Sequence, residues 1–288
     1  MLRLIVNPIA GNGHARKIGQ LVDEALTRRK IPHQLLWTEH PGHASELSRQ
    51  AAADGAETVI AIGGDGTAFE TAVGLMGSQT AMGIIPAGTG NDFVKALHTP
   101  TPWEQALEHI LSTPARPLDV GTMNDTFFLN ECGAGFDVMV LDYALRAKKF
   151  VRGLLPYLYG VIRAIFAYHP FRMRIELDDD LVLDGSYLVC SIANGRFIGG
   201  GIPISPEADV ADGYFDIVVL DSVPRRRLFR YLPGLLGGKI LSFDITKHYR
   251  CKKCTLTSPH MRLNIDGEIW PMEKATFTCR ENALLMHW

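Results

Sequence analysis

One acid among four glycine or threonine residues gives this sequence its clearest chemical pattern, Gly63-Gly64-Asp65-Gly66-Thr67. An apolar run rich in Val and Ile precedes the pattern and an apolar helical pattern follows it, which predicts a buried strand, a tight turn and a helix. Glycines permit the tight turn, and free N–H groups at a helix start bind anions. Asp65 would repel a phosphate unless a cation intervenes, so the pattern favours magnesium-nucleotide chemistry over an ordinary strand-to-helix turn.

Two further glycine turns follow expected strands, at residues 7–13 and 86–92. The second gathers Thr89, Asn91 and Asp92 immediately before a helix. Asn and Asp are also good helix caps, but one cap does not need so many polar groups, so ligand contact is favoured. In a parallel sheet all three turns would lie at the carboxyl edge, where ligands bind.

Acids occur in two turns of the second half. Asp266 and Glu268 flank one glycine, so one could accept a proton from a hydroxyl nucleophile while the other holds a metal or orients its partner; a plain Asp-Gly hairpin turn is the alternative. Asp209 and Asp212 lie in a turn that could bind a hard cation through carboxylate and carbonyl oxygens, or could simply join two strands.

The secondary-structure pattern that must position these residues changes near residues 114–121. Before this point strand and helix alternate, which predicts a doubly wound parallel α/β domain over residues 1–121. After it, β-rich segments predict an antiparallel β-sandwich domain over residues 122–288, whose last strand could return to the first domain. Expected strands are at 2–6, 34–38, 59–62, 82–85, 126–130, 172–177, 187–193, 214–220 and 262–265, and expected helices are at 15–29, 44–53, 68–76 and from 93.

Composition restricts the class of protein. Of 288 residues 47% are apolar and 21% charged, and the net charge of −2 gives no basic field for nucleic acid. Five scattered cysteines and no secretory start favour a reduced cytoplasmic compartment, and Cys251-x-x-Cys254 lacks the second ligand pair of a zinc site. No apolar run reaches the roughly 18 residues of a membrane span, so any membrane contact would be peripheral.

Basic residues beside apolar ones occur in two segments. The first has Arg146, Lys148, Lys149 and Arg152 before an apolar run, and the second is residues 224–236, which begins with Arg225, Arg226 and Arg227. Such segments suit anionic lipid headgroups. Helices that cover the sheet with a basic face in water are the alternative, and the sequence leaves both open.

Taken in order, the motifs resemble the bacterial diacylglycerol kinase-like lipid kinase family, which is related to sphingosine and ceramide kinases and more distantly to NAD kinases. The resemblance covers nearly the whole chain. Its motifs are Asn7-Pro8-x-x-Gly11-x-Gly13, Gly63-Gly64-Asp65-Gly66-Thr67 with Glu70, Pro86-x-Gly88-Thr89-x-Asn91-Asp92-Phe93, and Asp266-Gly267-Glu268. Gly-Gly-Asp-Gly alone is shared with NAD kinases, whereas the combination is specific.

The resemblance implies an ATP- and magnesium-dependent kinase for a lipid hydroxyl, with its active site in a cleft between the two domains. It implies Asp266 and Glu268 as catalytic acids, with Glu268 as proton acceptor, and Asp65 and Asp119 in the charge network near the metal. A structural magnesium ion is implied at Asp212, with main-chain oxygens of Asp209 and Tyr214. The residues implied to contact the nucleotide are Asn7, Pro8, Ile9, Ala10, Gly11, Thr38, Gly63, Gly64, Asp65, Gly66, Thr67, Ala68, Phe69, Glu70, Thr89, Asn91 and Asp92.

The chain departs from the family pattern at two places. Position 69 is Phe where relatives usually have Asn, which bears on nucleotide preference, and Val94-Lys95 replaces the usual Ala-Arg. Two other functions stay open: an NAD kinase, and a non-catalytic nucleotide- or lipid-binding protein of the same fold. The sequence does not name the acceptor lipid, and exposed strand edges in a sandwich would allow a homodimer.

Overall fold

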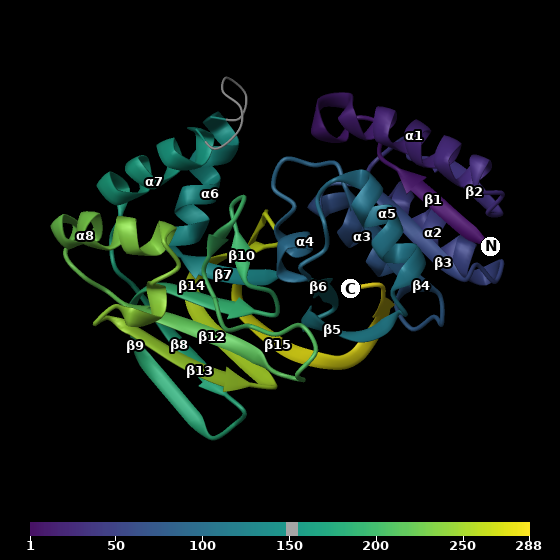
Figure 1. Cartoon of the computed structure of the whole chain (residues 1–288). Coiled ribbons are helices and arrows are strands. Elements are labelled where there is room, and N and C mark those ends of the chain that lie inside the picture. The colour runs from purple at the N-terminus through teal and green to yellow at the C-terminus, as the bar shows by residue number, and fades with distance from the viewer. Residues whose placement is uncertain (148–154) are drawn as a thin grey trace. The chain divides into compact units, whose positions relative to one another are not determined.

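The computed structural model describes residues 1–147 and 155–288. They form two compact units, each described here by itself: unit 1 is Met1–Val120 with Glu281–Trp288, and unit 2 is Gly121–Arg280. Figure 1 labels most of the helices and strands of both units. Of the basic residues predicted to contact lipid, Lys148, Lys149 and Arg152 lie outside the described residues.

Unit 1 is built on a parallel sheet in the order β15-β4-β3-β1-β2, in which the C-terminal end of β15 (Glu268–Met286) joins β4 at Met286 and Met82. Alternate residues of β1 and β3 point to opposite faces, so both faces of this sheet are apolar and buried. The strands are β1 (Leu2–Val6), β2 (His33–Trp37), β3 (Thr58–Gly63), β4 (Ala81–Pro86) and the beginning of β5 (Arg116–Met123).

Helices cover both faces of the unit 1 sheet. Apolar residues of α1 and α5 pack on the face formed by Leu4, Val6, Ile60 and Ile62, while α2 and α3 pack against each other and against β1 and β3. This is the doubly wound arrangement expected from the alternating pattern. The helices are η1 (Ala10–Gly13), α1 (His14–Arg28), α2 (His43–Ala53), α3 (Asp65–Leu75), α4 (Asp92–Ala96) and α5 (Trp103–Ser112).

Unit 2 is an antiparallel β structure around one apolar core. Its long strands β9 and β14 each pair with β7 over one part and with β8 over another, which encloses that core. The strands are β6 (Thr126–Phe128), β7 (Glu131–Gly135), β8 (Phe171–Leu177), β9 (Leu181–Ala193), β10 (Phe197–Ile198), β11 (Ile202–Pro203), β12 (Phe215–Asp221), β13 (Thr246–Cys251), β14 (Lys253–Ile265) and β15 (Glu268–Met286).

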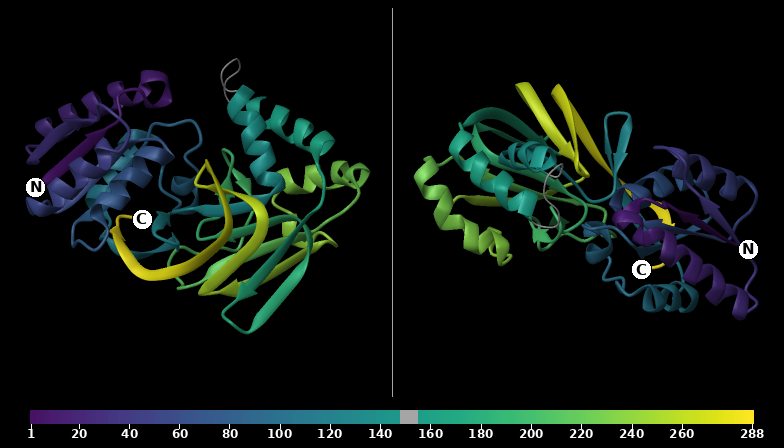
Figure 2. Two further views of the ribbon diagram at one scale, coloured as in Figure 1. Left: turned by 180° about the vertical axis from the view of Figure 1, so that it is seen from behind. Right: turned by 90° about the horizontal axis from the view of Figure 1, so that it is seen from above.

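A second apolar cluster lies between the strands of unit 2 and its helices. It joins Ile165 of α7 and Leu228 of α8 to Val189 and Val218 of the sheet. Figure 2 shows these helices grouped at one side of the unit 2 strands. The helices are α6 (Phe136–Ala147), α7 (Leu155–Ala167), α8 (Arg225–Leu236) and η2 (Ile240–Ser242).

The predicted fold class, an α/β domain followed by a β-sandwich, is confirmed. All five cysteines are buried and free, including Cys251 and Cys254 at the junction of β13 and β14. Among the described residues, no helix is both long enough and apolar enough to cross a membrane.

Candidate active site

Three turns of unit 1 lie side by side because the strands that lead into them are in parallel register. Val6 pairs with Ile62, and Gly63 pairs with Pro86, so β1, β3 and β4 end at the same edge. Backbone hydrogen bonds continue past the strand ends: Asn7 N–H donates to the Ile62 carbonyl at 3.1 Å, and Ala87 N–H donates to the Gly63 carbonyl at 2.7 Å. The glycine-rich turns therefore form one continuous backbone surface.

Glycine is required at the centre of this surface because the backbones approach closely. A Cβ atom on Gly88 would lie 2.4 Å from the Cα of Gly64, and one on Gly11 would lie 2.1 Å from the Ala87 carbonyl oxygen. Both distances are far below van der Waals contact. We name this surface, made by the turns at residues 7–13, 63–67 and 86–92, the glycine edge.

Asp65 is the first residue of α3 and lies at the glycine edge. Its Oδ1 accepts the Phe93 N–H at 3.2 Å, so it ties the second turn to the third. Burial raises the pKa of Asp65, and the neighbouring Asp92 raises it further, while backbone N–H groups of residues 91–93 partly offset this. A cation beside two adjacent carboxylates would favour their charged forms, so the donor set suits magnesium.

Most polar side chains predicted to contact a nucleotide are engaged in shaping the turns. Asn7 donates from Nδ2 to Thr67 Oγ1 at 3.3 Å and accepts the Ile9 N–H at 3.2 Å. Asn91 closes the third turn by bonding both the carbonyl and the N–H of Gly88. These residues hold the backbone in place, which leaves ligand contact to main-chain groups and to exposed side chains.

The remaining predicted contacts differ in their surroundings. Glu70 accepts the N–H of Ala44 at 3.2 Å and so ties α3 to the start of α2. Thr38 continues β2, with its N–H donating to the Val6 carbonyl at 2.9 Å. Thr89 is exposed and Phe69 is half-buried.

Asp119 is buried in unit 1 and joins two distant parts of the chain. Its Oδ1 accepts the Asn282 N–H at 2.8 Å, so it ties β5 to the last strand. This contact gives Asp119 a structural role within unit 1.

Asp266 and Glu268, predicted as catalytic acids, belong to a hairpin of unit 2. Asp266 and Gly267, both with positive φ, form a two-residue turn between Ile265 and Glu268. The Asp266 carboxylate accepts the N–H groups of Leu129, Asn130 and Glu131 at 2.7, 3.1 and 3.0 Å. Glu268 begins β15 and is exposed. The two acids thus have different surroundings, and Glu268 is the more exposed of the two.

Two buried acids of unit 2 escaped the sequence analysis. Glu131 and Asp137 flank Gly133, where a Cβ atom would lie 2.0 Å from Asp137 Oδ2 and 2.8 Å from Glu131 Oε1. Burial raises the pKa of Asp137 to about 6, and burial together with Asp137 raises that of Glu131 well above its usual range. Within the described chain, one oxygen of each carboxylate has no hydrogen-bond partner. The available signal was a glycine-rich strand with one acid at its first residue and another two residues after its end.

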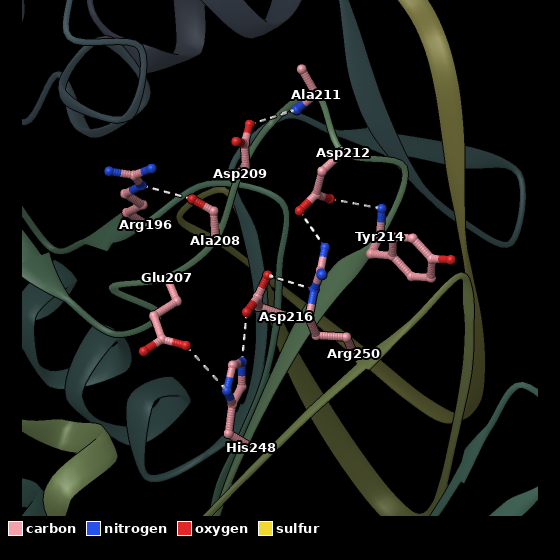
Figure 3. A network of polar contacts seen from close by, with 10 residues as sticks. All are labelled: Arg196, Glu207, Ala208, Asp209, Ala211, Asp212, Tyr214, Asp216, His248 and Arg250. Carbon is pink, nitrogen blue, oxygen red and sulfur yellow. Dashed lines mark hydrogen bonds and ion pairs between the residues drawn. The ribbon is translucent and has the colours of Figure 1, made fainter.

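The predicted metal turn before β12 does not fit a structural cation by its side chains. The Asp212 carboxylate is paired with the Arg250 guanidinium, which supplies the charge that an ion would supply (Figure 3). In the described part of the chain, the one group of three His, Cys or acidic side chains with clustered ligand atoms is His40, His43 and Glu46, far along the sequence from this turn.

An apolar strip of α7 and α8 faces outward. Residues of α7 spaced three or four apart are exposed, and Phe166 contacts Phe229 of α8 with ring centroids 6.3 Å apart. Arg226, Arg227 and Arg230 are exposed on α8. We name this strip the α7–α8 surface; its apolar members are Leu155, Leu158, Tyr159, Ile162, Phe166 and Phe229.

A cavity of about 390 Å³ lies within unit 2, beside the start of α6. Val138, Met139 and Met261 give it apolar walls, while Arg146 and Arg262 bring guanidinium groups that share the Asp142 carboxylate. Its size is within the range of small-ligand pockets.

Comparison with known proteins gives two family models that together span most of the chain. Residues 1–123 match the model described as diacylglycerol kinase catalytic domain, and residues 130–287 match the YegS C-terminal NAD kinase beta sandwich-like domain.

Similar whole proteins are named as lipid kinases. A "Probable lipid kinase YegS-like" of Chromohalobacter salexigens is 32% identical, covering 89% of this chain and 85% of that protein. A "Diacylglycerol kinase" of Mycobacterium tuberculosis is 28% identical, covering 92% of this chain and 87% of that protein. A crystal structure of a Bacillus anthracis protein assigned as a diacylglycerol kinase is 25% identical with a TM-score of 0.83, covering 100% of this chain and 96% of the other.

Proposed function

Because this chain belongs to the diacylglycerol kinase-like lipid kinase family, we propose that it transfers the γ-phosphoryl group of ATP to the hydroxyl of a lipid. Diacylglycerol is the acceptor that the relatives' names suggest, and phosphatidic acid would be its product. The observation that carries this proposal is the glycine edge with Asp65 upon it.

The glycine edge supports the assignment of the nucleotide to unit 1. Phosphoryl transfer depends on positioning and charge stabilisation, since the protein supplies little covalent chemistry. Main-chain N–H groups at the starts of α1 and α3 would cradle the phosphates, because side chains are absent where Gly64 approaches Gly88 and where Gly11 approaches Ala87. Bulkier residues at these positions would fill the space.

Asp65 would hold magnesium with help from Asp92, and bound magnesium would neutralise the phosphate charge. Phe93 N–H fixes the orientation of the Asp65 carboxylate. Lys95 neutralises part of the charge on Asp92 through a contact of 3.3 Å. Phe93 and Lys95 therefore orient the two acids at the glycine edge.

Glu268 would accept the proton of the acceptor hydroxyl, and Asp266 would position it. An exposed carboxylate is available to a lipid hydroxyl, whereas the Asp266 oxygens already accept three N–H groups. Asp266 therefore acts through the hairpin, by fixing where Glu268 begins β15.

The lipid body needs an apolar environment, for which unit 2 offers two features. The cavity beside α6 suits part of an acyl chain, and the α7–α8 surface suits the edge of a bilayer. Arginines beside the exposed aromatic and aliphatic side chains would face anionic headgroups. Peripheral contact with an anionic membrane is thus part of the proposal.

The test is an assay of labelled phosphate transfer in mixed micelles. ATP labelled at the γ position and magnesium are incubated with the purified full chain and a panel of lipid alcohols, with NAD as a further acceptor. We expect label in one or more lipids and none in NAD. Label in NAD alone would establish the NAD kinase alternative, and ATP binding without transfer to any acceptor would establish the non-catalytic one.

A further inference from the structure

The turn before β12 gathers acids around one guanidinium group. Asp212 Oδ1 accepts the Tyr214 N–H at 3.0 Å, and Asp212 Oδ2 is paired with Arg250 Nη2. Both carboxylate oxygens therefore have protein partners. Figure 3 shows Arg250 reaching from its strand toward Asp212 and Asp216.

The pairing of two strands fixes the position of Arg250. It lies on β13 directly opposite Asp216 of β12, in antiparallel register. Its Nε is 4.0 Å from Asp216 Oδ2, and its guanidinium carbon lies 4.8 Å above the centre of the Tyr214 ring. The Arg250 side chain thus contacts Asp212 and Tyr214 of the turn and Asp216 at the start of β12.

The other acids nearby have partners of their own. Asp216 is buried, and its Oδ1 lies 2.5 Å from His248 Nε2, while Glu207 lies 3.7 Å from the other nitrogen of that ring. Asp209 accepts the Ala211 N–H at 3.1 Å. Among the described residues, the side chains of the acids at this turn do not bring three ligand atoms together.

We propose that Arg250 takes the place of the structural metal ion that the family resemblance implies at this turn. The guanidinium supplies the positive charge, and its planar fork holds the Asp212 carboxylate in a fixed orientation. Unit 2 is then stable without a divalent cation. The inference concerns folding, so it stands or fails independently of the proposed kinase activity.

Thermal unfolding of the nucleotide-free full chain tests this, in magnesium chloride and in EDTA. We expect the wild-type Tm to be the same in both. Arg250→Gln should lower Tm by roughly 3–8 °C, because it leaves Asp212 and Asp216 without their shared cation. Asp212→Asn should lower it by less, because Arg250 keeps its contact with Asp216. The double variant should lose little more than Arg250→Gln, since both changes remove the Arg250–Asp212 pair.

Arg172→Gln is the matched control, because Arg172 pairs with Asp184 on the exposed surface of the same unit. Its Tm should stay close to wild type. Arg250→Lys keeps the charge and should recover part of the loss, which separates the ion pair from a general failure to fold. A wild-type Tm that falls in EDTA, with the fall absent in Asp212→Asn, would overturn the inference. So would an Arg250→Gln variant no less stable than the Arg172→Gln control.

Discussion

At the scale of single residues, identical side chains have different roles because of their partners. Asp65 accepts backbone N–H groups of residues 91–93 and lies beside a second acid, Asp92, so its carboxylate is suited to a cation. Asp266 accepts three N–H groups and is suited to holding a hairpin. Both acids lie in motifs of the family resemblance, and their surroundings in the structure differ.

The buried Asp137 leads to a prediction about pH. Its pKa is raised to about 6 in the folded protein from about 4 unfolded, mainly by burial, so its contribution to stability is fully present below pH 4. That contribution is lost as pH rises through 6, by up to about 3 kcal/mol. We therefore expect Asp137→Asn to lose less stability than wild type as pH rises from about 4 to just above 6, a window set by these two pKa values.

Thermal or urea unfolding across this pH range checks the prediction. Asp180→Asn is the control, because Asp180 is an exposed acid of the same unit and should follow the wild-type pH dependence. An Asp137→Asn variant whose stability changes with pH in parallel with wild type would show that this carboxyl does not titrate near pH 6.

At the scale of elements, α7 has two apolar faces for different reasons. One face packs Ala164 and Ile165 into unit 2, as in any helix that covers a sheet. The opposite face exposes Leu155, Leu158 and Phe166 to solvent. A covering helix in water normally has a polar outer face, so the second apolar face indicates a nonaqueous partner.

The α7–α8 surface therefore predicts binding to vesicles. Phe166→Ser with Phe229→Ser should weaken sedimentation with phosphatidylglycerol-containing vesicles by roughly ten-fold per residue, because each ring loses its burial in the bilayer. Arg226→Ala with Arg227→Ala should weaken it for anionic vesicles only. Arg225 is left intact, because its Nε donates to the Tyr168 carbonyl and stabilises the fold.

Val182→Ser is the control, because Val182 is an exposed apolar residue of the β8–β9 hairpin outside this surface. It should leave vesicle binding unchanged. If the double phenylalanine variant binds as well as this control, α7 and α8 only cover the sheet and do not contact membrane.

At the scale of the whole chain, the sequence predicted most elements of unit 1, because the regular spacing of their apolar residues and their glycine turns are local signals. The helix expected at 15–29 is α1 (His14–Arg28), and the strand expected at 82–85 is β4 (Ala81–Pro86). Helix α5 was missed, although its apolar residues recur at helical spacing. The sequence pattern predicts only that alternating strand and helix give way to β-rich segments just after its C-terminal end.

Unit 2 was harder to predict because its long strands depend on distant partners. Strand β15 runs over 19 residues and includes Pro271 and several charged residues, so its sequence has no clear strand pattern. It forms by pairing with β14, while its last residues pair in unit 1. The Arg250–Asp212 pair is equally invisible in sequence, since 38 residues separate its members.

The most direct test of the proposed function is the rate of phosphate transfer from ATP to the best lipid acceptor, compared among wild type, Asp65→Asn and Glu268→Gln. We predict that each variant loses roughly 100-fold or more in rate, through lost metal binding and lost proton acceptance respectively. Glu268→Gln should keep the wild-type Tm, because Glu268 is exposed. A Glu268→Gln enzyme that transfers phosphate at the wild-type rate would contradict the proposed mechanism.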